Sequence, residues 1–136
     1  MARRALVTGS SRGLGREIAL ALEDAGLDVI GTARKTPDWA TEGSNFFAVD
    51  LADPVSTRLF SEHISTRSVD VLVNNAGINR ISPFVNIDEC DFRDVLEVNL
   101  ISPMLISLML IFLVRISPMP FSLVPLYGMP TSPMLR

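Results

Sequence analysis

The sequence predicts an α/β fold built on a parallel sheet. Three observations lead to this prediction: short apolar runs alternate with helical patterns, a glycine-rich turn follows the first run, and asparagine or aspartate follows later ones. A chain of 136 residues suits one domain with its own core. We expect an incomplete doubly wound sheet of about four strands, in the order 3-2-1-4, followed by an irregular apolar C-terminal segment.

The N-terminal part of the chain reads as a strand, a glycine-rich turn and a helix. The run 5–8 is apolar and ends at a glycine, as a buried strand does. Apolar residues recur at helical spacing over 14–25. Between them stand Gly9, Gly13 and Gly15. Glycine allows positive φ and leaves backbone N–H groups open to a pyrophosphate at the N-terminus of a helix, so the turn predicts a phosphate site.

The second predicted strand, 28–33, ends in a basic sequence. In dinucleotide sites an acid at this position binds the ribose 2′-hydroxyl of NAD, whereas an arginine accommodates the 2′-phosphate of NADP. Here Arg34 and Lys35 follow the strand, and Arg12 lies in the glycine-rich turn. The planar guanidinium of arginine matches phosphate geometry. The sequence therefore predicts NADP rather than NAD, and the competing interpretation is a solvated basic loop.

The middle of the chain repeats the strand-and-helix pattern. Phe46–Val49 is the third predicted strand, and Asp50 and Leu51 follow it directly. Asp53 and Pro54 are typical of a helix start, with the aspartate as cap and the proline in the first turn. The helical spacing that follows predicts a face packed on the sheet, made of Val55, Leu59, Phe60 and Ile64.

The fourth predicted strand, Val69–Val73, leads into Asn74-Asn75-Ala76-Gly77. Small residues allow a close backbone approach to a ligand, and the asparagines can bridge strand ends by hydrogen bonds. Asp88 then caps a predicted helix. Its apolar residues lie on one face, and they are Phe92, Val95, Leu96 and Leu100.

Four motifs follow in an order that resembles the short-chain dehydrogenase/reductase family. They are Thr8-Gly9-x-x-x-Gly13-x-Gly15, Asp50-Leu51-x-Asp53, Asn74-Asn75-Ala76-Gly77 and Val98-Asn99. The match runs from Leu6 to about Leu100, and its wording is closest to 3-oxoacyl-carrier-protein-reductase-like members. The resemblance implies a Rossmann-type fold and an oxidoreductase that moves a hydride between NADP and a small carbonyl or alcohol. It also implies that Asn99 holds a water of the proton relay, and that the cofactor is bound by Gly9, Ser11, Arg12, Gly13, Leu14, Gly15, Arg34, Asp50, Leu51, Asn75, Ala76 and Gly77.

The catalytic half of the family pattern does not follow these motifs. The family uses a serine, and a tyrosine with a lysine four residues further along one helix. The single tyrosine here is Tyr127, and Thr131 stands four residues on. Ser122 and Tyr127 would lack the activating lysine, which elsewhere lowers the pKa of the phenol. We therefore expect a chain that is inactive alone, and the alternative is a non-catalytic nucleotide-binding or interaction module.

The composition changes abruptly near residue 100. All 15 acidic residues precede it, whereas six of nine prolines and five of six methionines follow it. We interpret 1–100 as an NADP-binding half-domain and 101–136 as an apolar Pro/Met/Ser-rich tail, which suggests a truncated gene or an altered reading frame. The apolar run 104–114 is shorter than a membrane span, so we expect a buried helix or a surface for a homo-oligomer.

Charge and composition exclude several function classes. A net charge of −3 does not indicate a nucleic-acid partner. Cys90 is the single cysteine, interpreted as half-buried, and it suits a reducing cytoplasm. His63 is the single histidine and has no clustered ligands beside it, so no metal site is predicted. The N-terminus carries no apolar stretch long enough for an export signal, and we expect a cytoplasmic protein.

Overall fold

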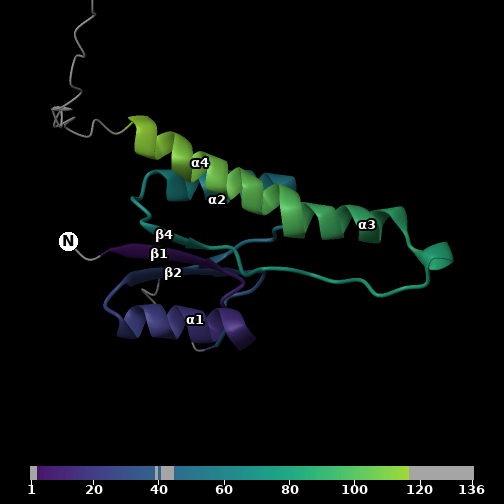
Figure 1. The fold of residues 1–136 in the computed structure, drawn as a ribbon, viewed down its shortest axis with the longest axis horizontal. Helices are drawn as coiled ribbons and strands as arrows, with labels where there is room; N and C mark the ends of the chain where they lie inside the picture. Colours follow the sequence, from purple (N-terminus) through teal and green to yellow (C-terminus); the bar gives the residue numbers. More distant parts are fainter. Residues whose placement is uncertain (1–2, 39, 41–44, 117–136) are drawn as a thin grey trace, which may run out of the picture.

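The computed structural model describes residues 3–38, 40 and 45–116, which form a parallel four-stranded sheet with helices on both faces (Figure 1). The strands are β1 (Arg4–Thr8), β2 (Asp28–Ala33), β3 (Phe46–Ala48) and β4 (Val71–Val73). Their order is β3-β2-β1-β4, which confirms the predicted 3-2-1-4 arrangement. All three strand pairs are parallel.

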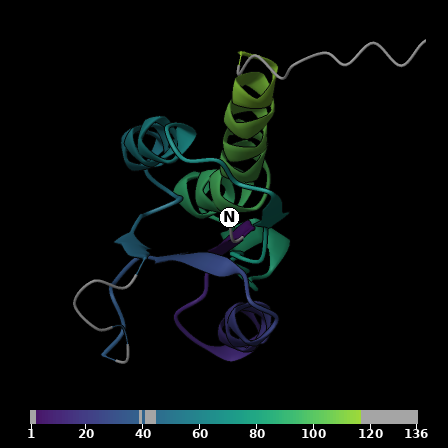
Figure 2. The same ribbon diagram turned by 90° about the vertical axis from the view of Figure 1, so that its left-hand side faces the viewer.

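The helices divide between the two faces of the sheet. Figures 1 and 2 show α1 (Gly13–Asp24) on one face and α2 (Pro54–Ser65) with α4 (Ser102–Ile116) on the other. A short 3-10 turn, Phe84–Asn86, precedes α3 (Glu89–Leu96). The π-helical turn η2 (Glu97–Ile101) joins α3 to α4, so the last three elements form one continuous helix.

The first strand forms the centre of the sheet. In register, Leu6 lies between Ile30 of β2 and Leu72 of β4. Ala5, Leu6 and Val7 are fully buried, because helices cover both faces of the strand. A continuous apolar run is the pattern expected of such a strand. The position of β1 between two layers of helices therefore explains why 5–8 contains no polar residue before Thr8.

Two aspartates begin helices as predicted. The carboxylate of Asp53 accepts the backbone N–H of Val55 at 3.0 Å, and that of Asp88 accepts the N–H of Cys90 at 2.9 Å. Each bond satisfies one of the N–H groups that lack a partner in the first turn of a helix. The Asp53 and Asp88 predictions are confirmed.

The predicted packing face of α2 is half wrong. Phe60 and Ile64 are buried, but Val55 and Leu59 are 54% and 57% exposed. The buried face of α2 also includes Thr57 and Ser61, because the helix packs against α4 as well as the sheet. Cys90 is exposed rather than half-buried. From its place in a polar loop we expect Trp39 to cover an edge of the core, but this residue lies outside the described part of the chain.

The structure carries regular helix past residue 100, in agreement with the helix expected over 104–114 and in place of the irregular segment expected around it. Ile106 of α4 is fully buried and belongs to the same core cluster as Leu6 and Ile30. The other face of the long helix exposes large apolar side chains, which we call the apolar row: Phe92, Leu96, Leu100, Met104 and Leu108. The predictions for Ser122, Tyr127 and the rest of 117–136 lie outside the described residues.

The helix that contains the apolar run 104–114 is longer than the run itself, so its length does not exclude a membrane span. The structure joins the apolar run to the helix before it, and Glu89–Ile111 forms 23 helical residues that contain a window of 18 residues with a mean hydropathy of 1.7. By length and composition alone this helix could cross a membrane, although one such helix is weak evidence. Its buried residues Val98 and Ile106 pack in the core of the domain.

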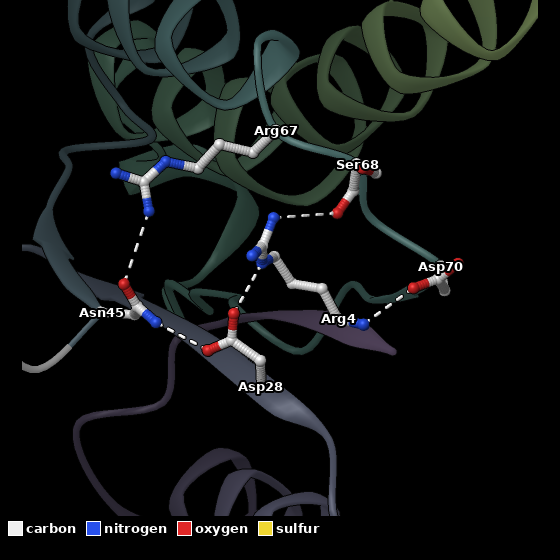
Figure 3. A network of polar contacts seen from close by, with 6 residues as sticks. All are labelled: Arg4, Asp28, Asn45, Arg67, Ser68 and Asp70. Atoms are coloured by element: carbon white, nitrogen blue, oxygen red, sulfur yellow. Dashed lines mark hydrogen bonds and ion pairs between the residues drawn. The ribbon is translucent and has the colours of Figure 1, made fainter. Parts of the chain in front are cut away.

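A polar network joins the amino ends of the strands, opposite the edge where ligands bind in parallel sheets (Figure 3). The Arg4 guanidinium lies 2.7 Å from the Asp28 carboxylate, which also accepts a hydrogen bond from the Asn45 side chain at 2.7 Å. The backbone N–H of Arg4 donates to Asp70 at 2.7 Å. Arg67 reaches Asn45 and lies over the ring of Phe47. The network connects β1 to β2 through side chains, and it connects β1 to the start of β4 through the backbone N–H of Arg4 and the side chain of Asp70.

Candidate functional site

A cavity of about 980 Å³ opens at the carboxyl ends of the strands. It is bounded by the turn after β1, the basic end of β2, the loop after β3 and the loop after β4. Nine of the residues predicted to bind a cofactor line it, namely Gly9, Ser11, Arg12, Arg34, Asp50, Leu51, Asn75, Ala76 and Gly77. The structure therefore brings together segments that are up to 68 positions apart in the sequence.

The glycine-rich turn adopts the backbone that its composition predicts. Gly9 and Gly13 have φ values of +69° and +58°. A Cβ on Gly9 would lie 2.8 Å from the Cα of Ala76, so only glycine lets the β4 loop approach this closely. The turn leads directly into α1 at Gly13, which directs the positive end of the helix dipole toward this end of the sheet.

Gly15 and Leu14 do not line the cavity, and neither does Gly13. Gly15 is buried, and a Cβ there would overlap the side-chain amide of Asn75 and the carbonyl of Gly9. Leu14 is 71% exposed. The third glycine of the motif thus allows the start of α1 to pack under the turn.

Asn75 and Thr8 fasten the turn to the end of β4. The Asn75 amide donates to the backbone carbonyls of Thr8 and Gly9 at 3.0 and 3.1 Å. The buried Thr8 hydroxyl accepts the backbone N–H groups of Asn75 and Ala76, both at 3.1 Å. Thr8 belongs to the first sequence motif, but no role was predicted for it. No local pattern could supply one, because its partners lie more than 60 residues away.

One end of the cavity is basic. Arg12 from the turn, with Arg34 and Lys35 after β2, contributes cationic side chains to the lining. The residues that follow β2 in the lining, up to Pro37, include no acid. Asp50 lies nearby, but one of its carboxylate oxygens accepts the backbone N–H of Ala52 at 3.0 Å within its own loop. This end of the cavity is suited to a phosphate group.

Asn99 lies at the other end of the site, in the π-helical turn. Its side chain accepts the backbone N–H of Ile78 at 2.9 Å and donates to the carbonyl of the same residue at 2.8 Å. The two bonds use both polar atoms of the Asn99 side-chain amide, and together they hold the loop that follows β4 in place at Ile78. Asn99 does not line the cavity itself, but Gly77, Ile78 and Val98 do. π-Helical turns are frequent at functional sites.

Two charged residues near Asn99 were not predicted. Arg80 and Asp94 both line the cavity, and the Arg80 guanidinium lies 3.1 Å from the carboxylate of Asp91. The loop before α3 gives no periodic signal, so the sequence alone could not place Arg80 beside the helix. Among the residues that the structure describes, no group of three or more His, Cys, Asp or Glu side chains could hold a metal ion.

These features define a class: a doubly wound α/β domain with a glycine-rich turn and an asparagine loop that meet at the carboxyl ends of parallel strands. Comparison with known proteins narrows the class. The family model described as short chain dehydrogenase matches residues 3–114. The chain belongs to the short-chain dehydrogenase family, a family of oxidoreductases.

Relatives of known identity agree with this assignment. The chain is 38% identical over 106 residues to 3-oxoacyl-(acyl-carrier-protein) reductase FabG of Salmonella typhimurium, an alignment that covers 72% of this chain and 43% of the relative. It is 37% identical over 112 residues to FabG of Staphylococcus aureus, covering 74% and 46%. The chain therefore spans less than half the length of these curated relatives.

Solved structures share the fold. A short-chain dehydrogenase from Streptomyces avermitilis superposes with a TM-score of 0.75 at 35% identity, covering 85% of this chain and 45% of that one. A putative NAD(P)-dependent gluconate 5-dehydrogenase from Beutenbergia cavernae, with bound NADP, gives 0.74 at 35% identity, covering 84% and 50%. Both confirm the Rossmann-type fold.

Proposed function

We propose that the cavity binds NADP(H) and that the chain is the cofactor-binding half of a short-chain oxidoreductase. The observation that carries the proposal is the pairing of the glycine-rich turn with Arg12, Arg34 and Lys35 around one cavity. The turn and the N-terminus of α1 would receive the pyrophosphate. The cations would receive the 2′-phosphate, which NAD lacks. The bound NADP of the Beutenbergia cavernae relative supports this choice.

The places of the other predicted residues in the cavity indicate which part of the cofactor each of them would contact. Asp50 and Leu51 lie after β3, where the adenine ring would rest between the loops. Ala76 and Gly77 bring backbone close to the ribose on the nicotinamide side, because a larger side chain would fill that space. Asn99 would fix the Ile78 backbone, to which it is hydrogen-bonded, beside the cofactor. It would also hold the water of the proton relay that the family resemblance implies.

Titration of both dinucleotides tests the cofactor choice. We expect the full chain to bind NADP⁺ more tightly than NAD⁺ in isothermal titration calorimetry. Arg34→Ala should weaken the binding of NADP⁺ about tenfold, because a charge-assisted contact to phosphate is lost. The affinity for NAD⁺ should change by less than about twofold. Arg58→Ala is the matched control, since Arg58 is an exposed residue of α2 paired with Glu62. Tighter binding of NAD⁺ would contradict the proposal.

The chemistry that the family performs is proposed for a completed site. A small carbonyl would be reduced, or an alcohol oxidised, by hydride transfer at the Asn99 end of the cavity. Lys35 is the single lysine of the chain and stands at the phosphate end. This observation favours the second candidate, a nucleotide-binding module without turnover. NADPH oxidation by the purified chain at the rate of a heat-killed control would support the module, and a higher rate would favour the enzyme.

We further propose that the protein is cytoplasmic. We expect it in the soluble fraction without detergent, because Val98 and Ile106 of the long helix are committed to the core of the domain. Recovery only with detergent would favour insertion of Glu89–Ile111 into a membrane.

A further inference from the structure

Ser102 lies at the junction between the π-helical turn and α4, with a fully buried side chain. Its hydroxyl is 2.9 Å from the backbone carbonyl of Leu51 and 3.1 Å from the hydroxyl of Thr57, which is also fully buried. These partners precede Ser102 by 51 and 45 positions. The contact therefore fastens the start of α4 to the loop after β3 and to α2.

The hydrogens of this contact can be assigned. A carbonyl can only accept, so Ser102 donates its single hydroxyl hydrogen to Leu51. Thr57 must then donate to Ser102, because Ser102 has already given its own hydrogen to Leu51 and the bond between the two hydroxyls needs the hydrogen of Thr57. Glu97 lies 3.4 Å from the same hydroxyl and would need the hydrogen already given to Leu51. The shorter bond to Leu51 fixes the direction of the chain from Thr57 through Ser102 to Leu51.

The contact joins the two ends of the cavity. Leu51 lines the cavity on the side proposed for adenine, and Val98 lines it beside the Asn99–Ile78 clamp. Asn99 precedes Ser102 by three positions in the same helix. A shift of α4 against the Leu51 loop would therefore move Asn99 relative to the loop that it clamps.

We propose that Ser102 is a positioning residue that sets the Leu51 loop and the Asn99 clamp at a fixed distance across the cavity. The role rests on the proposed cofactor function. Ser102 touches no cofactor in this arrangement, and it acts through the Leu51 carbonyl and through the helix that carries Asn99. Removal of the fully buried Ser102 hydroxyl would leave the Leu51 carbonyl without this hydrogen bond.

The test compares two buried serines of the full chain. Ser102→Ala removes the contact to Leu51. Ser61→Ala is the matched control, because Ser61 is equally buried but donates within α2 to the carbonyl of Thr57 at 2.8 Å. We expect Ser102→Ala to weaken the binding of 2′,5′-ADP about tenfold and Ser61→Ala to change this affinity less than about twofold. Both are measured at a temperature where both variants are folded.

A second readout follows the clamp itself. In ¹⁵N spectra without nucleotide, Ser102→Ala should shift the backbone amide of Ile78 and the side-chain amide of Asn99, and Ser61→Ala should leave both in place. If neither variant nor the wild type binds 2′,5′-ADP, the cofactor proposal fails, and the Ile78 and Asn99 signals still decide the role of Ser102. Equal effects of the two serine variants on these signals would overturn it.

A variant of the donor extends the test if Ser102→Ala does not fold. Thr57→Val removes the hydroxyl that donates to Ser102 and leaves the Leu51 bond possible. We expect it to move the same amide signals by a smaller amount, and Thr57→Ser to restore them because the donor returns. Unmoved signals in Thr57→Val, with the protein folded, would contradict the proposal.

Discussion

Gly13 and Gly15 lie two positions apart in one turn, yet different constraints act on them. Gly13 has a φ of +58° with open space where a Cβ would be, whereas Gly15 lies against Asn75 and the backbone of Gly9. Gly13→Ala should cost about 1 kcal/mol, the strain of the left-handed region. Gly15→Ala should cost about 3 kcal/mol, because backbone must shift. Urea unfolding of both variants measures the difference, and equal stabilities would contradict it.

Two neighbouring asparagines provide a second test at the residue scale. Asn75 donates to two backbone carbonyls of the turn, while Asn74 makes one contact to Ser107 at 3.4 Å. Asn75→Ala should destabilise the fold by about 2 kcal/mol, since the carbonyls of Thr8 and Gly9 lose a donor. Asn74→Ala should stay within about 0.5 kcal/mol. Denaturant midpoints decide, and a larger loss for Asn74→Ala would refute this account.

Nine of the residues predicted from motifs line the cavity, because the motifs that contain them depend on local backbone. The turn from Gly9 to Gly13 needs positive φ, and glycine shows that need directly in the sequence. The roles of Thr8, Arg80 and Ser102 could not be predicted in the same way. Each depends on an atom brought near by another element, and nothing in the neighbouring sequence encodes that atom.

At the scale of elements, Asp53 offers a test of how α2 begins. Its side chain accepts the N–H of Val55. Asp53→Ala should lower stability by about 1 kcal/mol, which corresponds to a fall in Tm of about 4 °C for a domain of this size. Asp53→Asn, which caps as well, should stay near the wild type. A thermal melt measures both, and equal losses in the two variants would assign the effect to charge instead of capping.

The helix α4 tests where the folded unit ends. Ile106 is fully buried in the core, and Leu108 is 61% exposed two positions on. Ile106→Ala should cost about 3 kcal/mol, whereas Leu108→Ala should change stability by less than about 0.5 kcal/mol. Such a result would place residues beyond 100 inside the cooperative unit. Equal and small effects would show that α4 contributes little to folding.

The sequence predicted that helices α1, α2 and α3 exist, together with the caps of α2 and α3, but not which side chains of α2 are buried. Helical spacing marks an apolar face, and Val55 and Leu59 fit it as well as Phe60 and Ile64. The choice among them is made by α4, which lies more than 40 residues further on and buries Thr57 and Ser61. The composition change near residue 100 likewise marked no structural boundary within the described helix.

At the scale of the whole molecule, the apolar row gives the protein a surface suited to association. Its five members recur every four residues and are exposed along one face of the long helix. We expect the protein to self-associate, because a contiguous apolar surface of this kind favours burial. The double variant Leu100→Glu, Leu108→Glu should sediment more slowly than the wild type at equal concentration. A monomeric wild type at all concentrations would contradict the expectation.

The central place of β1 has a consequence for synthesis. A ribosome releases Arg4–Thr8 before the other three strands of the sheet, but the strand that flanks it on the far side is Val71–Val73. The N-terminal strand therefore waits for some 65 further residues before both its edges are paired. Because closing such long loops is slow, the nascent chain would expose this strand, which is buried in the folded domain, during that interval. Chaperone demand should thus be greatest before residue 73 emerges, and should fall once the sheet has closed around its oldest strand.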